Sequence, residues 1–394
     1  MGETNIIPHA DFAVIGGGPA GASAARRLAR RGASVMLFER QKMPRAKPCG
    51  GGLSERAMAC LDFPVPDALI DAEVCGARVH FGGASAEARL DRRVAVLVTR
   101  SRFDHFLLQK AEECGARTVW AEVRSIERRP GEVALATSEG EFTAACAIVC
   151  EGANRRLSRN VRPPDGPDEQ GFCLEADVPA ARPDRHADLA DILDVHFGFV
   201  GRGYGWLFHH GSYYSIGVGD LCSRFRDPLG TFRQFAVERG VDAGGIRPRG
   251  HFVPCGGLRR ALCADRVLLA GDAGGWVDPF LGEGLAYAIR SGQVAAEVAL
   301  EALARGDLSR RGLAPFEARS REEFGRDLEA ALTLSRIAHR WPGLFIRALA
   351  AEEETLAKYL RVELGEVSYR EFLWWLLRRA PRLWISLRWD RRSA

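Results

Sequence analysis

The chain has 394 residues, of which 46% are hydrophobic and 27% charged, and its formal net charge is +4. These values are typical of a soluble globular protein with two or three packed lobes, and so small a charge does not indicate a nucleic-acid partner. Because the ten scattered cysteines form no C-x-x-C pair, and no signal-peptide pattern or bilayer-length apolar run stands out, we expect a cytoplasmic protein without a zinc site or disulfide framework.

The first predicted strand, residues 12–15 (FAVI), runs into GGGPAG and a helix-forming stretch. Gly16, Gly18 and Gly21 stand in G-x-G-x-x-G spacing, which permits a tight turn, a close approach of a pyrophosphate and close packing of helix on strand. Glu39 follows the second predicted strand, where a carboxylate accepts hydrogen bonds from ribose hydroxyls. The pattern predicts a site for a dinucleotide with a free ribose diol, such as FAD or NAD.

Residues 47–53, KPCGGGL, place Cys49 beside three glycines. The residue types alone leave three interpretations of Cys49: a redox or catalytic thiol, a metal ligand, or a small residue in a loop that passes close to a ligand. We predict no metal site, because the sequence offers Cys49 no partner ligands. Gly50 and Gly51 suit a backbone that runs close to a bound molecule.

Interrupted apolar segments at 74–81, 94–98, 171–178, 192–199, 204–208 and 213–219 predict a mostly antiparallel sheet. The period-two spacing of Tyr204, Trp206 and Phe208 puts these rings on one face of a strand. That face either walls an apolar cavity or packs as ordinary core under the sheet. His210 is expected on the same face and is a candidate proton donor, because imidazole titrates near neutral pH.

Residues 266–290 contain a further predicted strand, VLLA, which ends at Gly271 and Asp272. A loop rich in proline and glycine follows, and a helix is expected to begin near Gly282. A carboxylate beside a helix N-terminus suits a sugar-phosphate chain and a polarised ring carbonyl. By itself, this pattern is also that of an ordinary β–α turn.

The two glycine-rich sites together resemble those of FAD-dependent oxidoreductases related to the aromatic hydroxylases. Two segments narrow the resemblance to the geranylgeranyl reductase family: KPCGGGL and the Tyr-x-Trp-x-Phe…Gly-x-Gly segment at 204–219, YGWLFHHGSYYSIGVG. The resemblance covers roughly residues 10–305.

Membership of this family would imply FAD as cofactor. Asp272 would contact the ribityl or phosphate part of FAD, and Gly284 and Leu285 would lie under the isoalloxazine. Arg100, in a segment that resembles the family's Arg-x-x-Phe-Asp helix, would contact FAD, and Val123 would lie beside the adenine.

The resemblance also implies roles around the substrate. Gly50 and Gly51 would run along the flavin, and Cys49 would lie at the substrate side of that loop, either as one link in a proton relay or as a small loop residue. The residues that it places against the substrate are Tyr204, Trp206 and Phe208.

We therefore expect an α/β protein, α+β overall, in which a Rossmann-like FAD-binding domain carries an inserted, mostly antiparallel β-sheet substrate domain and C-terminal helices. The expected boundaries are 1–62, 99–160 and 259–305 for the FAD-binding domain, 63–98 and 161–258 for the substrate domain, and 306–394 for the helical region.

The predicted activity is reduction of carbon–carbon double bonds in an isoprenoid or related lipid by hydride transfer from reduced FAD. The alternatives are an FAD-dependent monooxygenase or halogenase acting on an apolar or aromatic substrate, and a lipid-binding flavoprotein without catalysis. No second dinucleotide fingerprint is visible, so the electron donor is either NAD(P)H bound transiently or a donor such as ferredoxin or a quinol.

The C-terminal segment, YREFLWWLLRRAPRLWISLRWDRRSA, interleaves tryptophan with arginine. This composition is typical of a membrane interface, so one interpretation is peripheral contact of residues 369–392 with the inner face of the membrane. The other interpretation is that the tryptophans pack over the substrate cavity or another lobe. The four tryptophans are Trp374, Trp375, Trp384 and Trp389.

Overall fold

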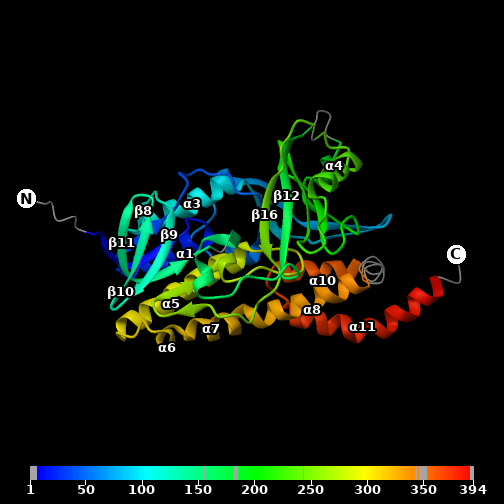
Figure 1. Cartoon of the computed structure of the whole chain (residues 1–394). Coiled ribbons are helices and arrows are strands. Elements are labelled where there is room, and N and C mark those ends of the chain that lie inside the picture. Colours follow the sequence, from blue (N-terminus) through cyan, green and yellow to red (C-terminus); the bar gives the residue numbers. More distant parts are fainter. Residues whose placement is uncertain are drawn as a thin grey trace, which may run out of the picture.

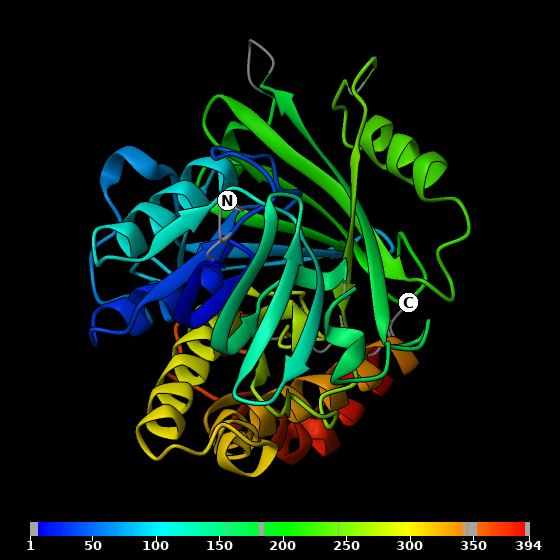
Figure 2. The same cartoon turned by 60° about the vertical axis from the view of Figure 1, so that its left-hand side comes forward.

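The computed structural model describes residues 7–154, 156–180, 185–242, 244–341, 345 and 353–390, and only the backbone at 154, 353 and 380–390. Two β-sheet regions lie side by side, and a layer of helices runs beneath both (Figure 1). Figure 2 shows the same layer from another side, with the first sheet in front of the second.

The first sheet has eight strands, with a parallel centre in the order β18-β11-β1-β2-β8. Its apolar side chains alternate between two cores, one under each face. Phe12 and Val14 belong to the core shared with helices, and Ala13 and Ile15 to the core on the other face. The strands are β1 (His9–Ile15), β2 (Val35–Phe38), β8 (Arg117–Val119), β9 (Val123–Arg129), β10 (Glu132–Thr137), β11 (Gly140–Val149), β17 (Cys263–Ala264) and β18 (Val267–Leu269).

Helices α1 (Pro19–Ala29) and α5 (Leu285–Ala304) pack together against one face of this sheet, with α3 (Arg100–Glu112) beside α1. A Cβ on Gly292 would lie 2.1 Å from the Ala20 carbonyl oxygen, so only glycine permits the close approach of α5 to α1. This approach brings the two predicted glycine-rich sites, which are far apart in sequence, to one edge of the sheet.

The second sheet has seven strands and is antiparallel except for the pair β13–β5. Helix α4 (Pro228–Glu238) covers one face through Phe232 and Phe235. The other face turns toward the helical layer, which leaves room for a cavity between them. In sheet order the strands are β16 (Arg249–Pro254), β12 (Gln170–Pro179), β15 (Tyr213–Leu221), β14 (Tyr204–His209), β13 (Ile192–Phe197), β5 (Gly76–Phe81) and β6 (Ala84–Arg89).

A three-stranded sheet joins the two regions. It pairs β7 (Ala95–Val98) with β3 (Gly52–Ser54) on one side and β4 (Ile70–Val74) on the other. Helix α2 (Glu55–Ala59) follows β3 directly, with Ser54 as its N-cap. The glycine loop at 47–52 is thus anchored at its end by strand pairing.

The C-terminal helices form the layer under both sheets (Figure 1). An apolar stripe on α8, including Leu334 and Ala338, packs with α10 and α11 in the core beneath the second sheet. These helices are α6 (Arg310–Leu313), α7 (Pro315–Ser320), α8 (Arg326–Arg340), α10 (Glu353–Glu363) and α11 (Tyr369–Asp390), with a π-helical turn at Arg321–Gly325 before α8.

The predicted fold class is confirmed: a Rossmann-like region, a mostly antiparallel second sheet and a helical C-terminal part are all present. Among the described residues, no helix combines the length and the apolar character that a bilayer span requires.

Candidate functional site

The turn between β1 and α1 depends on glycine at the predicted positions. A Cβ on Gly16 would lie 2.3 Å from the Cys150 carbonyl oxygen, and one on Gly21 would lie 1.8 Å from the Gly16 carbonyl oxygen. Gly16 also has a φ of 108°, which L side chains rarely adopt. Gly18 is the N-cap of α1 and makes no side-chain cap, so the first N–H groups of the helix can meet a phosphate.

Glu39 is buried at the end of β2 and held in place on both oxygens. Its Oε2 accepts from the Gly17 N–H (2.9 Å) and its Oε1 from the Gln41 N–H (3.0 Å). The Arg45 guanidinium lies 3.4 Å from Glu39 Oε2 and 3.3 Å from Asp104 Oδ2. A carboxylate has about four lone-pair positions, so Glu39 keeps acceptor positions for the ribose hydroxyls that the sequence predicts as its partners.

Arg100 forms a buried ion pair with Asp104 one turn along α3, with both nitrogen–oxygen distances at or below 3.0 Å. Burial disfavours its charge, but the Asp104 carboxylate and the neighbouring Cys49 thiol outweigh burial, so the pKa of Arg100 lies above its ordinary value. Arg100 therefore remains a cation between α3 and the glycine loop.

Asp272 lies next to the N-terminus of α5. The turn Gly271–Ala273 is tied to α5 by a hydrogen bond from the Gly271 N–H to Ser291 Oγ (2.9 Å). A Cβ on Gly284, the N-cap of α5, would lie 3.8 Å from Asp272 Oδ1. The carboxylate and the helix start, which Leu285 follows, are thus brought together as the sequence predicts.

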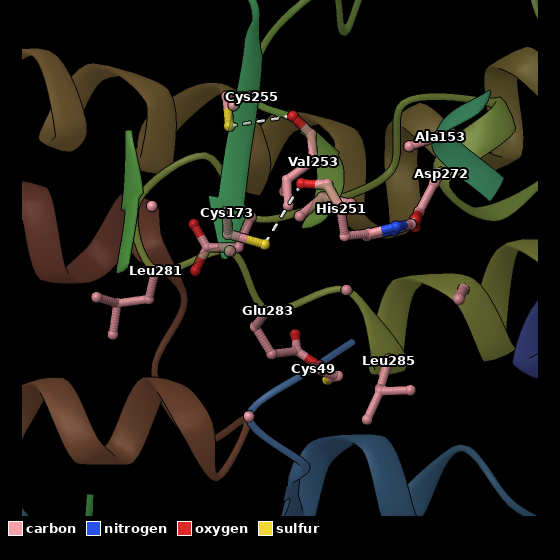
Figure 3. A pocket seen from close by; sticks show the side chains of 18 of the residues that line it. Cys49, Ala153, Cys173, His251, Val253, Cys255, Asp272, Leu281, Glu283 and Leu285 are labelled. Atoms are coloured by element: carbon pink, nitrogen blue, oxygen red, sulfur yellow. Dashed lines mark hydrogen bonds and ion pairs between the residues drawn. The ribbon is translucent and has the colours of Figure 1, made fainter. Parts of the chain in front are cut away.

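Two basic residues that the sequence did not predict as site residues complete this corner. The His251 ring lies against the Asp272 carboxylate, with Nε2 3.9 Å from Oδ2 (Figure 3). Lys47 Nζ is 2.5 Å from His251 Nε2. Burial raises the pKa of Asp272, but His251 and Lys47 outweigh it and bring that pKa below its ordinary value. Burial also lowers the pKa of Lys47 and of His251.

Val123 is the first residue of β9. Its carbonyl oxygen accepts from Arg156 Nη2 (2.9 Å), and Arg156 Nη1 lies 3.3 Å from Glu122. The Glu151 carboxylate accepts N–H groups of Arg156 and the two residues that follow it, which fixes this loop. Val123 is buried at this loop and lines the cavity, and its contact with adenine stays a prediction.

The glycine loop lies against the second sheet. A Cβ on Gly50 would lie 2.8 Å from the Phe208 ring, and one on Gly51 would lie 2.5 Å from the Val98 carbonyl oxygen. Gly51 also has a φ of 76°. Protein contacts alone therefore demand glycine at both positions, while a Cβ on Gly52 would meet open space. Cys49 Sγ accepts from the Gly51 N–H (3.4 Å), which stabilises the bend.

His210 contacts this loop on the side that faces away from the cavity. Its Nε2 lies 3.1 Å from the Gly50 carbonyl oxygen, and its Nδ1 lies 3.0 Å from both Asp71 Oδ2 and the Tyr213 hydroxyl. Strand β14 ends at His209, so the alternation that was expected to carry His210 onto the aromatic face stops before it. His210 is absent from the described residues that line the cavity.

One cavity of about 1040 Å³ joins these features. It runs from the Gly16 turn past Asp272 and Cys49 into a chamber between the second sheet and helices α8 and α10. A Cβ on Gly217 would lie 2.1 Å from the Trp206 ring, so glycine there lets the indole lie flat on the sheet. The apolar lining of the chamber includes Val79, Leu193, Val195, Phe197, Tyr204, Trp206, Phe208, Phe280, Leu281, Phe345, Leu356, Tyr359 and Leu360.

A separate cluster, His80, Asp194 and His196, lies on β5 and β13. Each His Nε2 hydrogen-bonds its own Asp194 oxygen, at 2.7 and 2.6 Å. The two rings are stacked at 4.1 Å and nearly parallel (3°), so their lone pairs do not converge on one point. The arrangement suits a carboxylate that bridges two imidazoles better than it suits a metal ion.

The comparisons with known proteins agree with this geometry. An FAD binding domain model matches residues 9–170. Over 346 residues the chain is 30% identical to digeranylgeranylglycerophospholipid reductase 2 of Methanothermobacter thermautotrophicus, covering 83% of this chain and 87% of the relative. It is 32% identical over 309 residues to geranylgeranyl diphosphate reductase of Rhodobacter capsulatus, covering 75% and 76% of the two chains. The chain belongs to the geranylgeranyl reductase family.

The fold of a geranylgeranyl bacteriochlorophyll reductase-like protein from Thermoplasma acidophilum matches over 97% of this chain and 99% of that one, with a TM-score of 0.80 and 21% identity. As a member of the geranylgeranyl reductase family with a matching FAD binding domain, the protein is an FAD-dependent oxidoreductase. The glycine turn between β1 and α1, the buried Glu39 carboxylate, and Asp272 with its two basic neighbours are chemically suited to hold FAD.

Within this family member, the structure also reveals positioning residues that sequence reasoning missed. Arg45 joins Glu39 to Asp104, and Lys47 and His251 flank Asp272. Arg162, almost fully buried, donates to the Gly274 carbonyl oxygen and to Asp165 (2.6 Å) and so braces the turn after Asp272. Only Lys47 lies in a segment that the sequence singled out.

Proposed function

We propose that the protein saturates carbon–carbon double bonds of a geranylgeranyl chain, with hydride from reduced FAD. The observation that carries this proposal is one continuous cavity. It joins the predicted FAD site, at Gly16 and Asp272, to a chamber walled by Tyr204, Trp206 and Phe208. Relatives named for geranylgeranyl diphosphate and for a digeranylgeranylglycerophospholipid support a substrate with a long isoprenoid chain.

The chain's own residues bind and orient the substrate. An isoprenoid chain is apolar along its length, so an aromatic chamber binds it by excluding water and offers few polar partners. Tyr204 donates its hydroxyl proton to the Leu281 carbonyl oxygen and turns its ring to the cavity. When bound, FAD supplies the hydride chemistry, and the protein fixes which double bond meets it.

Cys49 and His210 stay predicted proton donors, and their contacts shape the test. The Cys49 sulfur accepts the Gly51 N–H, and His210 hydrogen-bonds the loop from outside the cavity. Both arrangements also suit residues that only position the loop. If either side chain supplies the proton, Cys49→Ala or His210→Gln slows alkene reduction by about 100-fold or more while FAD stays bound; a normal rate leaves only the positioning role.

The test of the proposed function is anaerobic. The enzyme with FAD, reduced by dithionite, is mixed with geranylgeranyl diphosphate or with a digeranylgeranylglycerophospholipid, and the product is examined by mass spectrometry. Gains of two hydrogens with stoichiometric reoxidation of the flavin are the expected result. NADPH, NADH and reduced ferredoxin are then compared as donors. Product oxygenation or halogenation on mixing the reduced enzyme with oxygen and halide would instead support the monooxygenase or halogenase alternative.

We further propose that α11 rests on an anionic membrane surface, from which lipid enters. Trp374 and Leu377 are 63% and 49% exposed, and the exposed Arg370 and Arg378 share their helix face. Trp375 instead stacks on Phe372 in the core, and the Trp384 and Trp389 side chains lie outside the described residues. Wild-type protein should sediment with phosphatidylglycerol vesicles at low salt, and Trp374→Ala should weaken that binding; equal sedimentation of the two would contradict the proposal.

A further inference from the structure

Four polar side chains form a buried hydrogen-bonded chain at the end of the chamber. The Tyr359 hydroxyl lies 3.1 Å from Glu363 Oε1 and 2.9 Å from the Tyr369 hydroxyl. Tyr369 in turn donates to Asp278 Oδ2. Two carboxyl groups, on α10 and on the loop before α5, are therefore connected through two phenol hydroxyls.

This chain faces both the cofactor turn and the substrate chamber. Asp278 begins the loop that ends at Gly284, and its backbone pairs with Glu283 across that loop at 2.8 Å. Asp278, Tyr359 and Glu363 all line the cavity, whereas Tyr369 is not among its described lining residues. Tyr359 and Glu363 are one helical turn apart and so share the inner face of α10.

The two carboxyl groups differ in how many of their oxygens already have a hydrogen-bond partner. Both oxygens of Asp278 are engaged, by Tyr369 and by the Phe280 N–H (2.7 Å). Glu363 uses Oε1 for Tyr359, and among the described residues nothing hydrogen-bonds its Oε2. Glu363 is thus the member of the chain with an oxygen available to a molecule in the chamber.

The surroundings raise the protonated fraction of both carboxyl groups. Burial raises the pKa of Glu363 to about 7 and that of Asp278 to about 6, although Arg56 opposes both shifts. Arg56 is itself paired with Glu283 (3.0 Å), which leaves less positive charge for the other acids. The other ionisable groups that face this chain from the packed elements are Arg56 on α2, Glu283 in the loop, Tyr287 on α5 and Asp327 on α8.

We propose that the Glu363 carboxylic acid, rather than Cys49 or His210, protonates the alkene held in the chamber, and that Asp278 replaces that proton through the two tyrosine hydroxyls. The inference rests on the proposed function, since saturation of a double bond consumes one hydride and one proton. Hydride from the reduced cofactor forms one C–H bond. The π electron pair takes the Glu363 proton to form the other, so the O–H bond breaks and a carboxylate remains.

When Asp278 has taken a proton from water, its O–H donates to the Tyr369 oxygen and the Tyr369 hydroxyl turns to donate to Tyr359. Shifting one proton along each link then restores Glu363. Tyr359 gives its proton to Glu363 and receives one from Tyr369, which receives one from Asp278. The carboxylate that results at Asp278 is reprotonated from water after the product leaves. Each hydroxyl ends in the state in which it began, so the relay conserves protons and moves no electrons.

The experiment follows one turnover of the dithionite-reduced holoenzyme with saturating geranylgeranyl diphosphate, across neutral pH. The wild-type rate should fall as pH rises through about 7, because the acid form of Glu363 is lost there. Glu363→Gln, which keeps the shape and the Tyr359 hydrogen bond, should slow flavin reoxidation by about 100-fold or more and lose the pH dependence. Glu354→Gln, on the exposed side of the same helix, is the matched control and should behave as wild type.

Tyr369→Phe separates the relay from the donor, because Tyr369 lies behind the cavity lining. It should leave the first turnover unchanged and slow later turnovers. Infrared difference spectra of the substrate-free holoenzyme, taken as wild type minus Glu363→Gln, provide a second readout: a protonated carboxyl band should remain in the difference near neutral pH, because the bands of other protonated acids cancel.

Wild-type rates and pH profile in Glu363→Gln would overturn the inference while leaving the proposed function intact. If wild type itself saturates no isoprenoid, the proposed function fails and the donor role fails with it. If that carboxyl band is absent, Glu363 holds no proton near neutral pH and the inference fails, whatever the turnover rates are. Should Glu363→Gln not fold, Tyr359→Phe, which cuts the chain at its next link, should lose repeated turnover in the same assay.

Discussion

Glu175 offers a measurable test of the electrostatics around the glycine loop. It lies on β12 at 1% exposure, and its Oε2 has no hydrogen-bond partner among the described residues. Burial and the nearby Asp177 raise its pKa to about 8, against the opposing effects of Arg249, 3.7 Å away, and of the Cys49 backbone. We expect Glu175 to be a neutral acid at neutral pH, and we predict that Glu175→Gln removes a pH dependence from stability.

The sign of the effect follows from the two states. The unfolded glutamate ionises near 4.5 and the folded one near 8. Between these values the folded state binds a proton that the unfolded state has lost, so stability declines as pH rises. From pH 5 to pH 8.5 the wild-type protein should lose about 4 kcal/mol more than Glu175→Gln, at 1.36 kcal/mol per pKa unit. Relaxation of the buried site makes this figure an upper value.

Urea unfolding of the holoenzyme, followed by circular dichroism at both pH values, measures the difference. The variant should be less stable than wild type, or equal to it, at pH 5 and more stable at pH 8.5. Glu127→Gln, an exposed strand position, is the control and should track wild type at both. If the stability difference between wild type and Glu175→Gln is the same at pH 5 and pH 8.5, Glu175 does not titrate as its burial requires.

Two further predictions concern the cofactor cradle. Gly51→Ala should lower the free energy of unfolding by about 3 kcal/mol, because alanine at a φ of 76° adds its own cost to the approach to the Val98 carbonyl oxygen. Gly52→Ala should change it by less than about 1 kcal/mol, and equal losses in thermal melts would refute the distinction. Glu39→Ala should weaken FAD binding by about 10- to 100-fold in a fluorescence titration, because ribose loses an ionised acceptor; unchanged affinity would contradict that role.

Local sterics explain which elements the sequence could predict. The strand expected at 12–15 is the end of β1, and the glycines around it are legible because a turn this tight tolerates no Cβ. The small sheet of β3, β4 and β7 was not predicted as a unit, since its pairing joins three segments that are distant along the chain. His210 does not lie on the aromatic face, as was expected, because strand β14 ends one residue before it.

Charged residues around the site were harder to predict, because their chemistry depends on burial. Lys47 and His251 meet only when β16 and the glycine loop come together, and neither belongs to a spacing that indicates a ligand. Nothing in the sequence distinguishes Glu363 from the many acidic residues expected on the surface, yet it is buried and lines the cavity. A carboxyl group acquires an unusual pKa from the elements packed around it, which single-sequence patterns do not record.

The determinants of substrate choice should lie apart from the cofactor motifs. The motifs that define the family lie before residue 306, whereas part of the chamber wall comes from α8 and α10 beyond it, including Leu332, Leu356 and Leu360. Cofactor recognition needs fixed turns and therefore leaves motifs, but an apolar wall needs only volume and shape, which many sequences satisfy. Differences in chain length or head group between family members should therefore be sought in these C-terminal helices rather than in the glycine-rich turns.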